Sequence, residues 1–271
     1  MEVVYPPQGG GIIPMKKLKI TILGSASGVP TGNRFPVSTV VESDDWYLFD
    51  AGEPCSSLLV RQKIPYREIK AVFISHMDPD HSGGIFMLIQ LMDLTGRKKP
   101  LSVFLPEEAI PGLNSYLKTV HLYPDRLRFP LTLRPLRNGF SYRSRGTRIT
   151  AFFNNHIKGR LKDVYPHLKL ESYSFRLSAG GRKVVYSGDI GGPADLSPLL
   201  TGETDLLITE MAHFQPEELM SFLSDKKIGT ILLNHIHPDL NDCEKKLLAI
   251  GRRYLGKKKV LVSRDGLKLA V

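Results

Sequence analysis

Cysteines and long apolar runs are scarce in this chain. Its 271 residues include two cysteines, Cys55 and Cys243, which have neither metal-finger spacing nor the numbers for a disulfide framework. No apolar stretch reaches the roughly 18 residues of a membrane span, and the N-terminus lacks the basic region and apolar core of a signal peptide. We therefore expect a cytoplasmic protein that does not span a membrane.

A domain linker and a clear internal repeat are also missing. With 42% hydrophobic residues the chain can form one large core, which predicts a single domain over residues 15–271. Residues 1–14 are rich in Gly and Pro, so we expect a tail that is disordered or that precedes the true start. Met15 would then be the true start, because the residues after it lead directly into the first apolar strand.

Segments with strand and helix patterns alternate along the chain. Short apolar runs predict strands, and longer amphipathic segments predict helices. Strands are expected near residues 18–23, 37–41, 46–50, 71–74, 101–104, 130–153, 172–178, 183–187, 205–209 and 229–234, and helices near 83–95, 107–120, 215–224 and 241–254. This order predicts an α/β fold of two sheets flanked by helices.

A cluster of polar side chains follows the apolar run 71–74. The segment Ser75-His76-Met77-Asp78-Pro79-Asp80-His81 contains two imidazoles and two carboxylates. Neutral His nitrogens and ionised Asp oxygens are donors for Zn, Mn and Fe(II), and a loop that leaves a buried strand can direct them to one point. Asp-Pro-Asp is equally common in turns, so this segment alone leaves a metal site and a structural turn open.

Three further candidate ligands follow apolar stretches downstream. These stretches, 149–153, 184–188 and 231–234, lead to His156, Asp189 and His235 respectively. Strand ends are rigidly placed, whereas loop side chains remain free to point into a shared cleft. The recurrence favours a metal site over unrelated turns.

From about Leu18 to the C-terminus the chain resembles the metallo-β-lactamase fold superfamily. The resemblance is carried by the glycine-rich opening 23–30, the turn Phe49-Asp50-Ala51-Gly52, the His/Asp cluster and Tyr186-Ser187-Gly188-Asp189. Residues 208–212 and 233–236 look like late motifs of the branch that holds tRNase Z and related phosphodiesterases. The resemblance implies a four-layer αββα sandwich with two mixed β-sheets flanked by helices.

The resemblance also implies a site for two divalent metal ions. One ion would be held by His76, Asp78 and His156 and the other by Asp80, His81 and His235, with Asp189 bridging them. Two such ions can lower the pKa of a shared water, present it as hydroxide and polarise a carbonyl or phosphoryl oxygen. No protein nucleophile is then required.

Roles for the residues around the ions follow from the same resemblance. Asp80 and Asp189 would act in catalysis as well as in metal binding. Asp50, Ser75 and Glu210 would lie behind the ligands, and Asp50 would orient a ligating His through its other ring nitrogen.

Asp78 departs from the usual family motif, His-x-His-x-Asp-His, which has a histidine at this position. Three carboxylate ligands would leave two divalent ions with a formal excess of one positive charge, which a bound hydroxide would neutralise. Oxygen-rich coordination favours Mn or Fe more than an all-histidine site does. Zinc is still the first expectation. Flavodiiron relatives also carry an acidic residue here, but their flavodoxin-like domain of about 150 residues is absent.

Two features separate this chain from tRNase Z itself. That family has His-Glu-Ala-Thr where this sequence has Thr209-Glu210-Met211-Ala212. In addition, only a short segment joins His156 to the strand at 172–178, which leaves no room for the long tRNA-gripping arm of that family.

Two more histidines, His213 and His237, follow strand ends that the resemblance places beside the metals. Either could bind a substrate anion or donate a proton to the leaving group, with structural packing as the alternative.

Positive charge is concentrated in residues 97–148, where eleven Lys and Arg face three acidic residues, within a formal net charge of +10 for the chain. This stretch could steer an anionic substrate, and Tyr142 among Arg137, Arg143 and Arg145 could stack a base. A solvated basic face is the alternative.

These observations predict a metal-dependent hydrolase that acts through a hydroxide held by two metal ions, with a phosphodiester or another anionic ester as substrate. The substrate could be a small anionic molecule or a nucleic acid, and a homodimer is left open. The alternatives are a lactone or thioester hydrolase, or a non-catalytic nucleic-acid-binding or biosynthetic accessory protein with the same fold.

Overall fold

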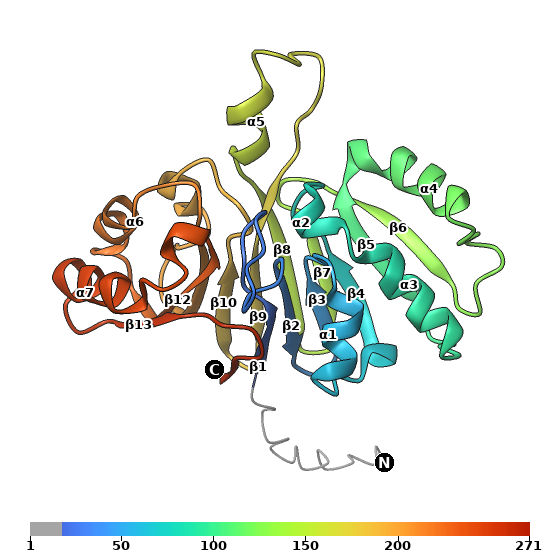
Figure 1. Cartoon of the computed structure of the whole chain (residues 1–271), viewed down its shortest axis with the longest axis horizontal. Helices are drawn as coiled ribbons and strands as arrows, with labels where there is room; N and C mark the ends of the chain where they lie inside the picture. The colour runs from blue at the N-terminus through green and yellow to red at the C-terminus, as the bar shows by residue number, and fades with distance from the viewer. Residues whose placement is uncertain (1–17) are drawn as a thin grey trace, which may run out of the picture.

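The computed structural model describes residues 18–271, so the tail expected at residues 1–14 lies outside the described part. Two seven-stranded sheets pack face to face, and helices cover both outer faces (Figure 1). The predicted four-layer αββα sandwich is thereby confirmed. Within residues 18–271 no helix is long and apolar enough to cross a membrane.

The first sheet has the strand order β14-β1-β2-β3-β4-β5-β6 and is antiparallel from β14 to β3 and parallel from β3 to β6. Its strands are β1 (Lys19–Gly24), β2 (Ser38–Glu42), β3 (Trp46–Phe49), β4 (Ile69–Phe73), β5 (Leu101–Pro106), β6 (Leu131–Leu136) and β14 (Lys268–Ala270). Because β14 pairs with β1, the C-terminal end of the chain completes the sheet that the N-terminal half builds.

The second sheet repeats this plan in the order β13-β12-β11-β10-β9-β8-β7, antiparallel from β7 to β10 and parallel from β10 to β13. Its strands are β7 (Ser141–Ser144), β8 (Thr147–Phe153), β9 (Tyr173–Ala179), β10 (Arg182–Tyr186), β11 (Thr204–Met211), β12 (Ile228–Ile236) and β13 (Lys259–Val262). Both sheets are therefore mixed, as predicted.

Helices cover the sheets in two groups (Figure 1). The first sheet carries α1 (Cys55–Arg61), α3 (Ile85–Leu94) and α4 (Ile110–Thr119), and the second carries α6 (Pro216–Leu223) and α7 (Glu244–Leu255). In α7 the buried residues Leu247, Gly251 and Leu255 recur every four positions, so one face packs on the sheet while Lys and Arg face water. Two short helices, α2 (Pro79–Ser82) and α5 (His156–Leu161), lie at loop positions, and α5 projects above the sheets.

The core between the sheets is rich in aromatic side chains. Phe73 stacks on Phe49 and on Phe104, and Phe175 of the second sheet meets Phe49 and Phe73 edge-on. Buried rings of this size contribute large apolar areas and fix the two sheets relative to each other. The strand ends that carry the candidate ligands are thus held by a rigid scaffold.

The predicted elements are largely present, and the differences concern short segments. The strands expected around 130–153 are β6, β7 and β8, and the chain crosses from the first sheet to the second between β6 and β7. The helices α1, α2 and α5 and the strands β13 and β14 were not predicted, because segments of three to seven residues are too short to show a helical or strand period clearly.

Lys258 anchors the end of α6. Its Nζ donates hydrogen bonds to the carbonyl oxygens of Leu223, Ser224 and Lys226 at 2.8, 2.6 and 2.8 Å. Lys258→Met should lower the free energy of unfolding by about 1–2 kcal/mol, because these carbonyl groups lose a charged donor. Urea denaturation will measure this change in the free energy of unfolding. The exposed neighbour Lys257 provides the control, and equal effects of Lys257→Met and Lys258→Met would contradict this role.

Candidate metal centre

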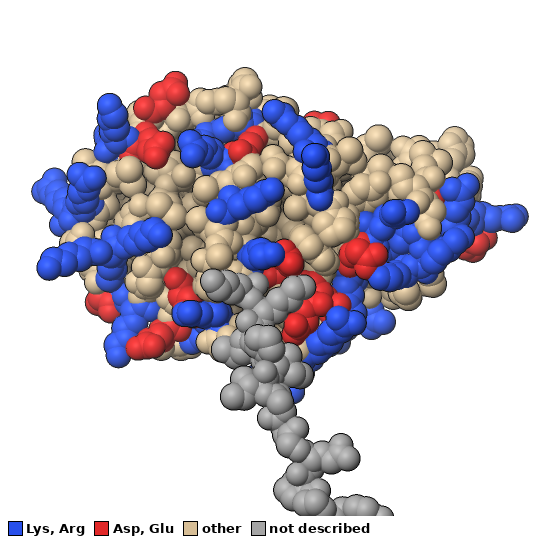
Figure 2. Space-filling model, turned by 90° about the horizontal axis from the view of Figure 1, so that it is seen from below, with Lys and Arg blue, Asp and Glu red and all other residues tan. Residues whose placement is uncertain are grey.

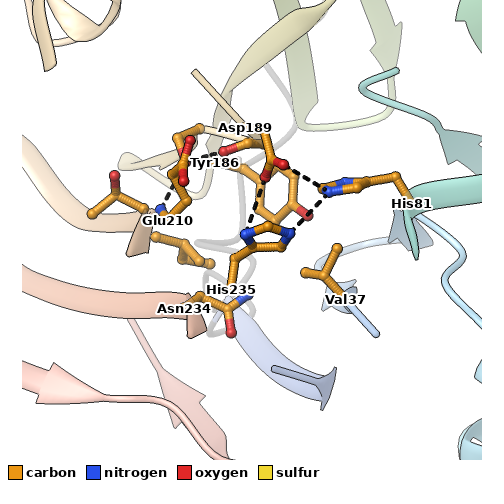
Figure 3. A pocket seen from close by; sticks show the side chains of 11 residues that line it. Val37, His81, Tyr186, Asp189, Glu210, Asn234 and His235 are labelled. Carbon is orange, nitrogen blue, oxygen red and sulfur yellow. Dashed lines mark hydrogen bonds and ion pairs between the residues drawn. The ribbon is translucent and has the colours of Figure 1, made fainter. Parts of the chain in front are cut away.

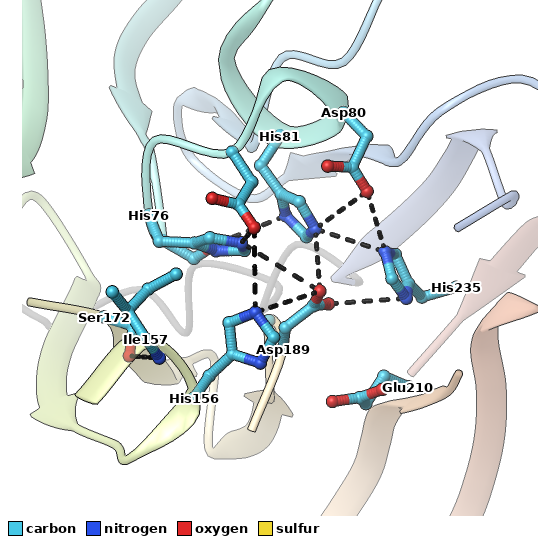
Figure 4. A network of polar contacts seen from close by, with 12 residues as sticks. His76, Asp80, His81, His156, Ile157, Ser172, Asp189, Glu210 and His235 are labelled. Atoms are coloured by element: carbon cyan, nitrogen blue, oxygen red, sulfur yellow. Dashed lines mark hydrogen bonds and ion pairs between the residues drawn. The ribbon is translucent and has the colours of Figure 1, made fainter. Parts of the chain in front are cut away.

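The seven predicted ligands come from separate loops and strand ends and meet at the same end of the two sheets (Figure 4). His76 and Asp78 follow β4, Asp80 and His81 lie on α2, and His156 begins α5. Asp189 follows β10, and His235 lies near the end of β12. Parallel strands direct their carboxyl ends to one edge of a sheet, which explains why residues so far apart in sequence converge.

The ligand atoms form two groups. The first group is His76, Asp78 and His156, in which Asp78 Oδ2 lies 3.7 Å from His76 Nε2 and 3.9 Å from His156 Nε2. The second group is Asp80, His81, Asp189 and His235. In it, His235 Nε2 lies 3.1 Å from Asp80 Oδ2 and 3.2 Å from His81 Nε2.

Asp189 lies between the two groups. Its Oδ2 is 3.2 Å from His81 Nε2 in the second group, and 4.0 and 3.8 Å from His76 Nε2 and His156 Nε2 in the first. The side chain is buried, and Oδ1 faces His235 Nδ1 at 3.4 Å. One carboxylate therefore reaches both groups.

Asp50 holds the second group from behind. Its carboxylate accepts hydrogen bonds from His81 Nδ1 at 2.8 Å, from Ser75 N and Oγ at 2.7 and 2.9 Å, and from Tyr186 Oη at 2.7 Å. With Nδ1 donating to Asp50, the lone pair of His81 Nε2 is left to face the cluster. Tyr186 was part of a recognised motif, but its contact with Asp50 was not foreseen.

Two residues of the site have backbone conformations that favour glycine. Asp50 has φ 55° and His235 has φ 50°. Such values are uncommon for residues other than glycine and gather at functional sites, where the surrounding structure compensates for the strain. Gly188, with φ 55°, precedes Asp189, and a Cβ there would lie 2.9 Å from Ser75 Cβ. Only glycine lets the loop that carries Asp189 approach Ser75.

The backbone around His156 is fixed by a buried polar network that the sequence did not reveal. Asn154 Oδ1 accepts hydrogen bonds from His156 N at 3.1 Å and from Ser172 Oγ at 2.5 Å. Its Nδ2 donates to Ser174 Oγ at 3.0 Å. This network connects the start of α5 to β9 and fixes the position from which the ring of His156 extends.

Glu210 and His213 form a further pair at the edge of the site. The buried carboxylate of Glu210 accepts hydrogen bonds from His213 Nδ1 at 2.7 Å and from the backbone N of Ile190 at 2.7 Å. His213 Nδ1 also lies 3.8 Å from Asp189 Oδ2, and its side chain is 36% exposed. Figure 3 shows His81, Asp189, Glu210 and His235 around the pocket beside this pair.

The structure does not bring His237 to the cluster. Its half-exposed ring caps a short turn, with Nδ1 accepting a hydrogen bond from Asp239 N at 3.2 Å. Among the described residues, the ring of His213 lies against the rings of His156 and His235, and His237 takes no part in these contacts. The expected role of His237 as a proton donor stays a prediction, and the contact that the structure shows for its ring is this turn cap.

Arg160 is a component of the site that the sequence interpretation missed. It lies on α5, one helical turn after His156, and its Nη1 donates to Asp78 Oδ2 at 2.8 Å. The same Nη1 lies 3.0 Å from His156 Nε2. Arg160 follows His156 by four residues, a spacing that places two side chains on the same face of a helix. This signal has a meaning only if α5 is helical, which the sequence did not show.

The charges within the cluster stabilise one another. Burial alone would lower the pKa of His81, but Asp189 and Asp50 hold it well above its ordinary value. Burial would raise the pKa of Asp189, but His235 and His81 hold it well below its ordinary value. Contacts with His156 and His76 hold the pKa of Asp78 well below its usual range. The carboxylates of Asp78 and Asp189 are therefore ionised at neutral pH, and a metal ion that binds His81 must displace a proton from its ring.

The cluster fits divalent metal ions. Three of its buried polar atoms, His76 Nε2, Asp189 Oδ1 and His235 Nδ1, have no hydrogen-bond partner among the described residues. Such atoms are uncommon in folded proteins, because removal from water without a new partner costs free energy. Imidazole nitrogens and carboxylate oxygens are the donors that Zn, Mn and Fe prefer, so these unpaired atoms match divalent cations.

The basic stretch at residues 97–148 does not supply the predicted base-stacking site. Tyr142 packs on Tyr47, Phe73 and Phe104 in the core between the sheets. Arg145 contacts the backbone of Asp44, which lies just before β3, whereas Asp50 follows the end of β3. Figure 2, which views the molecule from below and thus from the end away from α5, shows Lys and Arg interspersed with Asp and Glu. These features favour a solvated basic face.

Known proteins share this sequence pattern and fold. Residues 45–262 match a family model described as the beta-lactamase superfamily domain. The Ribonuclease Z of Methanosarcina mazei is 27% identical over 304 aligned residues, which cover 94% of this chain and 98% of that protein.

Two solved structures have the same fold. The metallo-beta-lactamase fold protein YhfI of Bacillus subtilis has a TM-score of 0.77 at 19% identity and covers 94% of this chain and 100% of its own. The short form of human tRNase Z has a TM-score of 0.71 at 19% identity, and the match covers 93% of this chain and 98% of that protein.

Proposed function

The chain belongs to the beta-lactamase superfamily, and we propose that it is a metal-dependent hydrolase that cleaves a phosphodiester or another anionic ester. The observation that carries this proposal is the convergence of seven His and Asp side chains around the buried carboxylate of Asp189. The Ribonuclease Z relatives support a phosphodiester, and with it a nucleic acid, as the substrate class.

We assign the two groups to two ions. His76, Asp78 and His156 would hold one ion, Asp80, His81 and His235 the other, and Asp189 would be shared. Zinc is the proposed metal, with manganese and iron as the alternatives that the three carboxylates favour. When bound, such a pair lowers the pKa of water and polarises the phosphoryl group.

The protein side chains then fix the tautomers of the histidines and supply a proton. Asp50 fixes the tautomer of His81, and Glu210 does the same for His213 through Nδ1. Because Nδ1 of His213 is taken by Glu210, Nε2 is the ring atom available to a substrate. We assign His213 as the group that donates a proton to the leaving oxygen, since it is partly exposed beside Asp189.

Hydrolysis of bis(p-nitrophenyl) phosphate by the purified, metal-reconstituted protein tests this function. We expect diester hydrolysis that is lost after chelation and restored by Zn, Mn or Fe. A paired assay with simple lactones and thioesters tests the alternative hydrolase class. Hydrolysis of lactones alone would overturn the phosphodiester assignment, and protein without metal or activity in either assay would favour an accessory role.

Charge reversal at Arg143 and Arg145 should leave this activity nearly unchanged. Both lie at the end of β7 that is close to the start of β3. The length of β3, about 13 Å, separates this end from Asp50. That separation exceeds the screening length of about 8 Å at physiological salt. Arg143→Glu with Arg145→Glu should change KM by less than about two-fold. A several-fold rise in KM that shrinks with added salt would show that this face does steer the substrate.

A further inference from the structure

Arg160 makes two contacts that involve the ligand atoms of the first group. Its Nη1 donates to Asp78 Oδ2 at 2.8 Å and approaches His156 Nε2 at 3.0 Å. These are the same two atoms that lie 3.9 Å from each other across the first group. The third ligand atom, His76 Nε2, is buried without a partner.

The contact with His156 and metal binding exclude each other. A neutral imidazole nitrogen that is not protonated has one lone pair, which either accepts a hydrogen bond or binds a metal. Asp78 Oδ2 has further lone pairs, but a guanidinium beside it places a positive charge next to an incoming cation. An ion that enters the first group must therefore displace Arg160.

Within residues 18–271 no similar competitor contacts the second group. Its atoms contact one another and Asp50, and the contacts described for Asp80, His81 and His235 include no Lys or Arg. The side chain of Arg160 is 49% exposed at the edge of the site, so it can swing into solvent without unpacking the core. The two groups thus differ in what an ion must displace.

We propose that Arg160 is an internal competitor for the first metal site, so that the two ions bind in order, first at the second group and then at the first. This inference rests on the ligand assignment of the proposed function. It adds a residue that sets the metal affinity of one site. It also connects this effect to Asp78, which stands where the family motif has a histidine, because the carboxylate of Asp78 binds the guanidinium of Arg160.

Titration of the metal-free protein with Zn²⁺ against a chromophoric chelator tests the proposal. The parent should take up one ion tightly and a second at least about ten-fold more weakly. Arg160→Gln should tighten the weaker event by about ten-fold, since a charge-assisted hydrogen bond is removed from its ligands, and leave the tighter event unchanged. Lys158→Gln is the matched control, because Lys158 lies on the same helix but its Nζ faces the ring of Phe153.

A second variant assigns the events to the groups. His156→Ala should abolish the weaker event and retain the tighter one, and its loss of the tighter event would overturn the proposal. An Arg160→Gln protein whose weaker event is unchanged or weaker than in the parent would show that Arg160 positions Asp78 instead of competing. In that case two ions still bind, and the proposed function stands. A parent that takes up no ion would refute the ligand assignment and this inference together.

Discussion

Replacing Asp189 by alanine is expected to reduce kcat/KM for a phosphodiester by about 10³-fold or more, because the proposed two-ion site depends on the one carboxylate that reaches both groups. Asp189 lies within 4.0 Å of His76, His81, His156 and His235. Its loss would remove a buried negative charge from between the two groups proposed to hold the ions. Elemental analysis should find less than the two ions per chain expected of the parent, and bis(p-nitrophenyl) phosphate hydrolysis measures the rate.

Asp225 gives the matched control for this variant. It is 73% exposed on the loop after α6, so Asp225→Ala should keep both metal content and rate near those of the parent. Thermal unfolding of both variants separates loss of chemistry from loss of fold. An Asp189→Ala protein that retains two ions and a near-parental kcat would remove Asp189 from its proposed bridging role.

The second large effect is expected at Asp50, which touches no substrate in the proposed mechanism. Asp50→Asn replaces an acceptor of four hydrogen bonds by an amide whose NH₂ group cannot accept from His81 Nδ1 or Tyr186 Oη. His81 then loses its fixed tautomer. Losses of this kind typically cost 10- to 100-fold in metal affinity, and we expect an effect of about this size at the second group.

Competition with a chelator measures that affinity, with Tyr186→Phe as the graded control. This change removes one of the four bonds to Asp50 and leaves His81 Nδ1 paired, so less than about ten-fold loss is expected. The first group should keep its affinity in both variants. Equal effects of the two variants would indicate that Asp50 acts through the packing of Tyr186 and not through His81.

Much of the candidate site could be predicted from the sequence because its ligands follow apolar strands. The runs before His76, His156 and Asp189 are local signals that need no knowledge of distant residues. The four-layer fold could be predicted from a local signal as well, because a chain of alternating strands and helices has few ways to cover two sheets. Within 130–153 nothing local marks the crossing from β6 to β7, so the sequence did not indicate which strands belong to which sheet.

The sequence by itself determined which residues offer metal-binding atoms and that they follow strand ends, because side-chain chemistry and apolar periodicity are local properties. Only the tertiary structure decided which atoms meet. Tyr186 reaches Asp50 across 136 residues, and Arg160 reaches Asp78 across 82. It likewise decided that Tyr142 is core and that Arg145 faces away from the site. Such pairings depend on strand register and on the direction of each side chain, and both are fixed only when the two sheets pack together.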